Sequence, residues 1–284
     1  MLIQSRDFTA AQLARFTALQ TEVYATLVEV SHTLAPGETE RAVAQRIHQA
    51  FKASFQLDSY FHVPVALFGE RTGYPGDFGQ LEALPTKRVL QAGEAAILDA
   101  APVIEGHTID CSYAVAPKAK GAAQRAFKEG DALLQQMRQL ILQRAGERAN
   151  MGDIAREVDA AIVAAGFENC HRKHIGKVLG HRITYVPGGR MARRTTLWGL
   201  NAVAGAWFFA TSARSSRGHP EVSPNWNHTR QSDTVMQPGL WAVEPHVARD
   251  GVGLKFEEML LVTDTEVRYL SDDLPHLQRW RGRR

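Results

Sequence analysis

Cysteine and long apolar runs are scarce in this chain of 284 residues. The two cysteines, Cys111 and Cys170, lie far apart in the sequence, which excludes a disulfide framework and a clustered thiolate metal site. No run of about 18 apolar residues could span a bilayer, and the N-terminal segment MLIQSRDFTAAQLARF lacks the apolar run of a signal peptide. We therefore expect a cytoplasmic protein without a membrane partner.

A strong charge excess is also absent. The net charge is +3, and the basic residues gather in the C-terminal tail 279–284 and around Arg190, Arg193 and Arg194. No basic stripe with interleaved aromatic residues runs through the rest, so we expect a solvated tail and no nucleic-acid partner. Because 44% of the residues are hydrophobic, the chain can bury a substantial core, and we treat residues 1–284 as one domain.

Helical and strand-like patterns alternate along the chain. Apolar residues recur at helical spacing in residues 8–35, and Thr39-Glu40-Arg41 begins a second amphipathic stretch that ends near Phe55. The same order, two helices followed by strand-like runs, then returns, which indicates an internal duplication. We predict an α+β fold in which helix, helix, hairpin units pack on one face of a curved antiparallel sheet. The other predicted segments are helices at 124–144 and 152–165 and strands at 60–68, 95–104, 108–116 and 177–185.

An irregular, aromatic stretch separates His181 from Glu244. Its glycine, arginine and serine content argues against one continuous element, and it is too aromatic for disorder. We predict an ordered insertion at about 186–217 that either covers a site or forms a subunit contact, and the sequence leaves both roles open.

Two aspartates interrupt the strand-like runs of the first hairpin. Asp99 follows Ala95-Ala96-Ile97-Leu98, and Asp110 follows Ile109. Burying a lone carboxylate is costly unless it is paired, protonated or bound to a cation. If the hairpin is centred between Ile104 and Glu105, the two aspartates lie opposite each other, and such a pair calls for a cation.

The C-terminal third repeats this pattern. Glu244 and Glu257 each stand in an apolar strand-like run, and alternation sends Glu257 and Glu258 to opposite faces. His181 adds a nitrogen donor. Taken singly, each of these residues is more often structural, but together four carboxylates and one imidazole form a hard donor set. Such a set suits a pair of divalent ions such as manganese, cobalt, iron or zinc.

These residues stand in motifs that resemble a known family. The motifs are Ile97-Leu98-Asp99 with Asp110 eleven residues later, Gly180-His181, the run QPGLWAVEP that contains Glu244, and Glu257 ahead of Leu260-Leu261-Val262-Thr263. They are similar to those of the pita-bread fold of methionine aminopeptidases, aminopeptidase P, prolidases and creatinases. The resemblance spans nearly the whole chain, and the Val-Thr ending selects Glu257 over Glu258.

The resemblance implies a single pita-bread catalytic domain and an aminopeptidase-like, metal-dependent hydrolase. Carried over, Asp110 and Glu257 would bridge two metal ions, Asp99 would complete one ion, and His181 with Glu244 would complete the other. A metal-bridging water would attack an amide bond near the N-terminus of a small peptide. Glu244 would also carry the proton to the leaving amine.

Two positions depart from the family pattern. A second histidine is usual after the ligand histidine, but Gly188 stands seven residues beyond His181, and His219 stands instead at the usual distance before Pro238-Gly239. We therefore predict His219 as a catalytic, substrate-binding histidine. Another substrate histidine is expected near Leu81 and Glu82, where none occurs. His62 could replace it, but we favour a surface or strand-edge role for His62, and structural roles for His107 and His246.

Three functions remain open from the sequence. A metal-dependent peptidase, active on a small peptide, is favoured by the complete ligand set. A non-peptidase enzyme on the same scaffold, acting on a specialised small molecule, is the alternative that the missing histidine supports. A catalytically silent binding module is the third, although such relatives tend to lose ligands. A homodimer is a further partner that the sequence allows.

Overall fold

Paired helices and strands alternate along the chain in the order that the sequence predicts. A computed structural model describes residues 2–76 and 82–282. The first half contains α1 (Ala10–His32), α2 (Glu40–Ser54), β1 (Leu57–Phe68), η1 (Gly69–Gly73), β2 (Ala96–Ile104), β3 (His107–Thr108) and β4 (Cys111–Val115). The second half begins with α3 (Gly121–Gly146), α4 (Met151–Ala164), β5 (Glu168–Asn169), η2 (Cys170–Arg172), η3 (Ile175–Lys177) and β6 (Val178–Arg182).

The chain then leaves this repeating order for an insertion and returns to it. The insertion and the segment after it contain α5 (Arg190–Arg194), β7 (Thr196–Leu197), β8 (Leu200–Asn201), α6 (Ala202–Ser216), η4 (Pro220–Val222), β9 (Asn225–Asn227) and η5 (Arg230–Ser232). The C-terminal part contains β10 (Gly239–Val243), β11 (His246–Arg249), β12 (Val252–Lys255), β13 (Glu258–Val262), β14 (Val267–Tyr269) and α7 (Pro275–Arg281).

Both N-terminal helices begin at threonine caps. The Thr9 side chain accepts from the backbone of Gln12, and the Gln12 side chain accepts in return from the backbone of Thr9, which forms a capping box. Thr39 caps α2 in the same position. The apolar residues that predict α1 form its buried face, with only Leu13 partly exposed, so the helical periodicity located this helix correctly.

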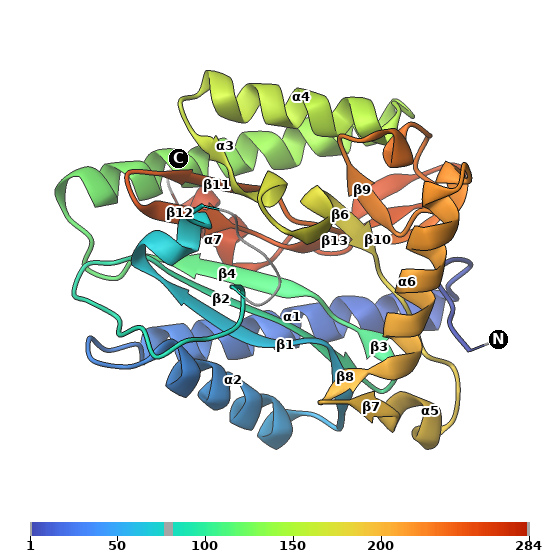
Figure 1. Ribbon diagram of the computed structural model, residues 1–284, viewed down its shortest axis with the longest axis horizontal. Coiled ribbons are helices and arrows are strands. Elements are labelled where there is room, and N and C mark those ends of the chain that lie inside the picture. The colour runs from blue at the N-terminus through green and yellow to red at the C-terminus, as the bar shows by residue number, and fades with distance from the viewer. Residues whose placement is uncertain (1, 77–81, 283–284) are drawn as a thin grey trace.

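The strands lie between the two helix pairs. In Figure 1, α1 and α2 run along one side of the strands, α3 and α4 run along the other, and α6 crosses at one end. In the described residues, β1, β2, β3, β4, β7 and β8 form one sheet, β14-β13-β10-β6-β9 a second, and β12-β11-β5 a third. All pairings within them are antiparallel except that of β1 with β8. The duplicated order is therefore present.

The first hairpin differs in register from the sequence prediction. Ile104 pairs with His107, and Asp99 pairs with Ser112, so the turn is centred between Glu105 and Gly106. Both turn residues have positive φ, 52° and 82°, as a two-residue type I′ hairpin turn requires. The prediction that Asp99 and Asp110 lie directly opposite each other is therefore wrong, and Asp110 lies in the short link between β3 and β4.

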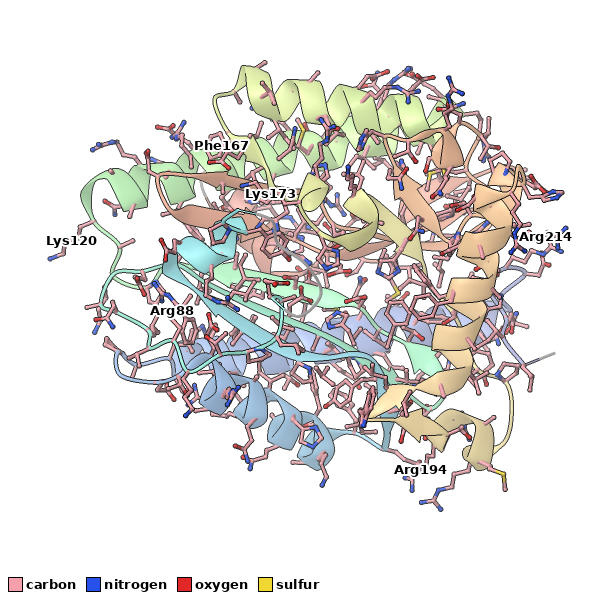
Figure 2. The ribbon with its side chains drawn as sticks, in the orientation of Figure 1. Arg88, Lys120, Phe167, Lys173, Arg194 and Arg214 are labelled. Atoms are coloured by element: carbon pink, nitrogen blue, oxygen red, sulfur yellow. The ribbon has the colours of Figure 1, made fainter. Side chains whose placement is uncertain are left out.

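The insertion contains a helix that the sequence analysis did not predict. Helix α6 spans Ala202–Ser216, and Asn201 caps it by accepting from Ala204 N. Arg194 of α5 and Arg214 of α6 extend outward at this end of the molecule (Figure 2). The insertion is thus ordered over these segments, although its apolar helix lacked a clear amphipathic pattern in the sequence.

The basic C-terminal tail is structured rather than solvated. Arg279, Trp280 and Arg281 end helix α7, Trp280 is buried, and Arg279 forms a bidentate ion pair with the buried Asp131 of α3. The solvated tail predicted for 279–284 is therefore wrong for Arg279 and Trp280, which contact the core, whereas the side chain of Arg281 is 57% exposed. No helix in the described ranges is long and apolar enough to cross a membrane.

A buried charged cluster ties α3 and α7 to β13. Glu258 is buried, and Arg138 donates to its two oxygens at 2.7 and 2.9 Å. His276 lies 2.8 Å from Glu258 Oε1. Burial alone would raise the pKa of Glu258, but His276 and Arg138 hold it below its ordinary value. Glu258 therefore points away from Glu257, as strand alternation predicts.

Replacing Arg138 with methionine is expected to lower the free energy of unfolding by about 3 kcal/mol, because it leaves a buried carboxylate without its strongest partner. The matched control is Arg268→Met, which removes the exposed pair of Arg268 with Glu266 and should cost about 1 kcal/mol or less. Urea denaturation followed by circular dichroism measures both. Equal losses for the two variants would contradict this account of the cluster.

Candidate metal centre

The five predicted ligands come from five separate segments and meet in one buried cluster. Asp99 stands on β2, Asp110 in the link before β4, and His181 on β6. Glu244 follows the end of β10, and Glu257 stands between β12 and β13. The side chain of Glu244 is 14% exposed, and those of the other four are 10% exposed or less.

Backbone pairing and one glycine bring these segments together. Ala242 pairs with His181, and Glu244 N donates to Leu179 O at 2.9 Å, which sets β6 beside β10. A Cβ atom at Gly180 would lie 2.2 Å from the carbonyl oxygen of Ala242, so this close approach requires glycine next to His181.

A bridge between the two halves of the fold completes the assembly. Tyr113 on β4 forms an isolated β-bridge with Phe256, which places Glu257 beside the first hairpin. The Tyr24 hydroxyl on α1 donates to the carbonyl oxygen of Glu257 at 2.6 Å and accepts from Glu257 N at 3.2 Å. Two elements of the first half, α1 and β4, therefore fix the position of Glu257, which belongs to the second half.

His181 stands among three of the carboxylates. Its Nε2 lies 3.1 Å from Asp110 Oδ2, 3.6 Å from Glu257 Oε1 and 3.9 Å from Glu244 Oε1. Its Nδ1 lies 3.2 Å from the carbonyl oxygen of Arg182. When a cation binds, a proton on Nδ1 would still satisfy that carbonyl, and Nε2 would lose its proton and direct its lone pair at the ion, which is the tautomer that a metal ligand needs.

His62 also belongs to the cluster. Its Nε2 lies 3.1 Å from Asp110 Oδ1 and 3.6 Å from Asp99 Oδ1, and its side chain is 36% exposed. The surface or strand-edge role that we favoured for His62 is therefore wrong. Strand β1 pairs with β2, and Val65 is opposite Asp99, but register shifts between Tyr60 and Val65 carry the imidazole to the carboxylates. Such irregularities leave no clear signal in the sequence.

Lys255 is the residue that the sequence analysis missed. Its Nζ lies 2.8 Å from Asp99 Oδ2, 3.1 Å from Glu244 Oε2 and 3.2 Å from Glu257 Oε2, and its side chain is 4% exposed. Burial lowers the pKa of Lys255, but the neighbouring carboxylates raise it well above its ordinary value. The signal was present, because a residue two before Glu257 in an extended run shares its face.

Positive charge balances the carboxylates unevenly. Burial raises the pKa of Asp110, but the adjacent His62 and His181 hold it well below its ordinary value. Burial and the neighbouring Asp110 raise the pKa of Glu257 to about 8. Burial lowers the pKa of His62, but Asp110 and Asp99 raise it to about 10. Glu257 is thus the carboxylate that lacks sufficient counter-charge.

The donor set fits a divalent cation. Within the described residues, Asp99 Oδ1 is a buried oxygen without a hydrogen-bond donor, and Glu257 Oε2 is ion-paired with Lys255 Nζ at 3.2 Å without a hydrogen bond of good geometry. Donor atoms of His62, Asp99 and Asp110 lie within 4.8 Å of one another, and so do those of Asp110, His181 and Glu257. Oxygen and imidazole donors at this spacing suit manganese, cobalt, iron or zinc.

Two aromatic rings border the cluster. The ring of Phe61 on β1 stacks on His181 with centroids 5.4 Å apart. Phe208 on α6 lies 5.5 Å from Phe61 and 6.3 Å from His181 in edge-on contacts. The insertion therefore places one side chain beside the predicted ligand histidine, while Trp198 and Met191 of the same insertion are exposed.

The other predicted histidines lie elsewhere. His219 caps η4, is about half exposed and faces Glu221 at 3.3 Å, and none of its described contacts is with the five ligands. His107 and His246 are buried and hydrogen-bond the carbonyl oxygens of Ile104 and Thr72. The expected position of the missing substrate histidine includes Leu81, which lies outside the described residues.

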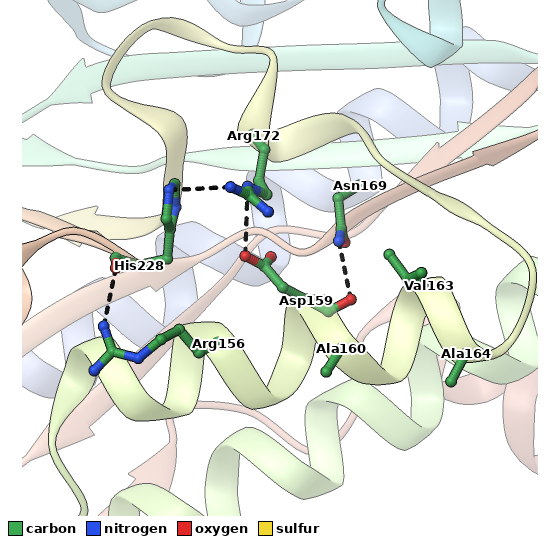
Figure 3. A pocket seen from close by; sticks show the side chains of 8 residues that line it. All are labelled: Arg156, Asp159, Ala160, Val163, Ala164, Asn169, Arg172 and His228. Carbon is green, nitrogen blue, oxygen red and sulfur yellow. Dashed lines mark hydrogen bonds and ion pairs between the residues drawn. The ribbon is translucent and has the colours of Figure 1, made fainter.

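A shallow groove of about 570 Å³ beside α4 is separate from this cluster. Asp159 forms an ion pair with Arg172 there, Arg172 contacts His228, and the Asn169 side chain donates to the Asp159 backbone (Figure 3). None of the five ligands lines it. These polar groups are paired with one another, so we assign the groove no role in the chemistry.

Comparisons with known proteins agree with this arrangement. The sequence matches metallopeptidase family M24 over residues 15–264. No curated protein matches the chain. Prolidase from Thermococcus sibiricus aligns with a TM-score of 0.64 at 15% identity, over 94% of this chain and 60% of that structure. X-Pro aminopeptidase from Thermotoga maritima aligns with a TM-score of 0.65 at 14% identity, over 95% of this chain and 64% of that structure.

A variant of Escherichia coli aminopeptidase P is a third similar structure, with a TM-score of 0.57 at 14% identity, over 98% of this chain and 61% of that one. The chain thus spans about three fifths of the length of these structures. At such identities the likeness establishes the fold, and it confirms the predicted α+β pita-bread architecture. The family match covers most of the sequence, and the chain therefore belongs to metallopeptidase family M24, a family of metal-dependent hydrolases.

Proposed function

We propose that this protein is a metal-dependent peptidase that cleaves an amide bond near the N-terminus of a small peptide. The observation that carries the proposal is the convergence of Asp99, Asp110, His181, Glu244 and Glu257 in one buried cluster. If these positions were only structural, apolar side chains would make the fold more stable there, because carboxylates buried together repel one another. Family membership supports the same reading.

Asp110, His181 and Glu257 would hold a divalent cation, with Asp99 and Glu244 completing the donor set. When bound, the cation supplies Lewis-acid chemistry, which activates water and stabilises the negative charge that develops on an amide carbonyl. The pair of ions that the resemblance implies, and the identity of the metal, stay predictions.

Side chains around the donors would handle protons and orient the peptide. Glu244 has a partly exposed carboxylate, and we assign it the transfer of a proton to the leaving amine. His62 faces Asp110 with more than a third of its side chain exposed, so its ring can contact a peptide bound at the cluster. His62 replaces His219 as our first choice for the substrate histidine, and a role for His219 stays a prediction.

The aromatic rings suggest an apolar side chain next to the cleaved bond. Phe61 and Phe208 lie against His181, so a substrate side chain there would meet two rings. The same two rings favour the second candidate function, a non-peptidase enzyme for a specialised small molecule, because Phe208 of α6 occupies space beside His181 that a peptide would need. A silent binding module is disfavoured, since all five donors are present and assembled.

The insertion at about 186–217 is proposed to act as a cover for the site through Phe208. Trp198, Met191 and Leu197 are exposed, and they would be the first place to look for the predicted homodimer contact. The cytoplasmic location also stays a prediction, with which the two buried free thiols are compatible.

Replacing Asp110 with alanine is expected to abolish divalent metal binding and to lower peptide hydrolysis at least about 10³-fold, because several kcal/mol of transition-state stabilisation depend on the cation. Hydrolysis of Met-Xaa and Xaa-Pro peptides with added manganese or cobalt measures the loss. Asp153→Ala, at an exposed aspartate of α4, is the control and should keep full activity. Full activity in Asp110→Ala would refute the proposed chemistry.

Replacing Phe208 with alanine is expected to raise KM for a peptide with an apolar first side chain about 10-fold, with little change in kcat, because a hydrophobic contact of this kind contributes about 1–3 kcal/mol. Phe209→Ala is the matched control, since the neighbouring ring is 71% exposed and should leave KM unchanged. Identical KM values for the two variants would show that α6 does not contact the substrate.

A further inference from the structure

Lys255 divides the carboxylate cluster into two sides. Asp99 turns Oδ2 to the lysine Nζ and Oδ1 toward His62, at 2.8 and 3.6 Å. Glu244 turns Oε2 to Nζ and Oε1 toward His181, at 3.1 and 3.9 Å. Glu257 turns Oε2 to Nζ at 3.2 Å and Oε1 toward His181 at 3.6 Å. Three carboxylates therefore share an ammonium on one side and imidazoles on the other.

The ammonium lies among oxygens that a second ion would need. Asp99 and Glu244 are the residues that the resemblance assigns to one metal ion each, and one oxygen of each accepts a hydrogen bond from Lys255 Nζ instead. On the imidazole side, Asp110 belongs to two groups of three donor atoms within 4.8 Å of one another. One group contains His181 and Glu257, and the other contains His62 and Asp99, whose second oxygen lies 2.8 Å from Lys255 Nζ. The lysine side of the cluster is thus occupied by an ammonium, and the imidazole side is the one that can accept a metal ion.

We infer that the centre holds one divalent cation, between Asp110, His181 and Glu257, and that the Lys255 ammonium takes the place of a second ion. This inference rests on the proposed function, because it assumes that the cluster binds metal. A lysine ammonium is a compact charge with three donor hydrogens, so it can satisfy three carboxylate oxygens but cannot act as a Lewis acid.

The lysine has little freedom to move aside. Its backbone is fixed by the pairing of Lys255 with His246 across β11 and β12. Its side chain is 4% exposed, so a second ion would have to displace the ammonium from three carboxylates inside the protein. Gly253 also holds β12 in place, because a Cβ atom there would overlap the Thr72 carbonyl oxygen at 1.9 Å.

The test is the manganese stoichiometry of the full-length protein, measured by calorimetric titration and by elemental analysis after equilibrium dialysis. We expect one ion per chain in the wild type and in Lys255→Arg, which keeps the charge. We expect two in Lys255→Met, which removes it. Lys173→Met, at a lysine labelled in Figure 2, is the control. Lys173 forms a partly exposed pair with Glu168, and its replacement should leave one ion bound.

Electron paramagnetic resonance gives a second readout that does not depend on activity. The wild type saturated with manganese should show the hyperfine pattern of an isolated ion, and Lys255→Met should show the coupling of an adjacent pair. Two coupled ions in the wild type would overturn the inference and leave the proposed function intact. One ion in both proteins would also overturn it, because the ammonium would not be what excludes the second. No ion in either would overturn the proposed function itself.

Discussion

The mutual repulsion of four clustered carboxylates, three of which are buried, is the constraint on which the rest of this structure depends. Two like charges about 4 Å apart repel by about 4 kcal/mol at an effective dielectric constant near 20, so the cluster requires compensating positive charge. His62 and His181 supply it around Asp110, and Lys255 supplies it around Asp99, Glu244 and Glu257. The proposed cation would supply the remainder beside Glu257, whose pKa burial and the neighbouring Asp110 raise.

The fold is arranged to hold these charges in register. Each half of the duplicated chain contributes ligands, and the bridge of Tyr113 to Phe256 joins the halves at the cluster. The close approach of β6 to β10 at Gly180 fixes the strand that carries His181, and the Tyr24 hydroxyl fixes the segment that carries Glu257. Glu258 lies outside the cluster and is paired separately with Arg138 and His276. The adjacent residues Glu257 and Glu258 therefore point in opposite directions, one toward the cluster and the other toward a structural ion pair.

The sequence predicted the parts that depend on local pattern. Helical periodicity located α1 to α4, carboxylates inside apolar strands identified Asp99, Asp110, Glu244 and Glu257, and the Gly180-His181 motif identified the fifth predicted ligand. It did not predict what depends on long-range geometry. The turn of the first hairpin is centred at Glu105-Gly106, one residue later than predicted, and this shift alters the register of the whole hairpin. The position of His62 depends on irregularities in β1, and α6 lacks an amphipathic pattern. Lys255 was overlooked because a cation among carboxylates is recognised only once the strands are assembled.

The most direct measurement is a crystal structure of the full-length protein grown with manganese, with anomalous diffraction data to locate the ion. The account predicts an anomalous peak bounded by Asp110, His181 and Glu257. Well-ordered side chains at these residues without a peak, in crystals where the manganese concentration is saturating, would contradict the claim that the carboxylate cluster is a metal centre.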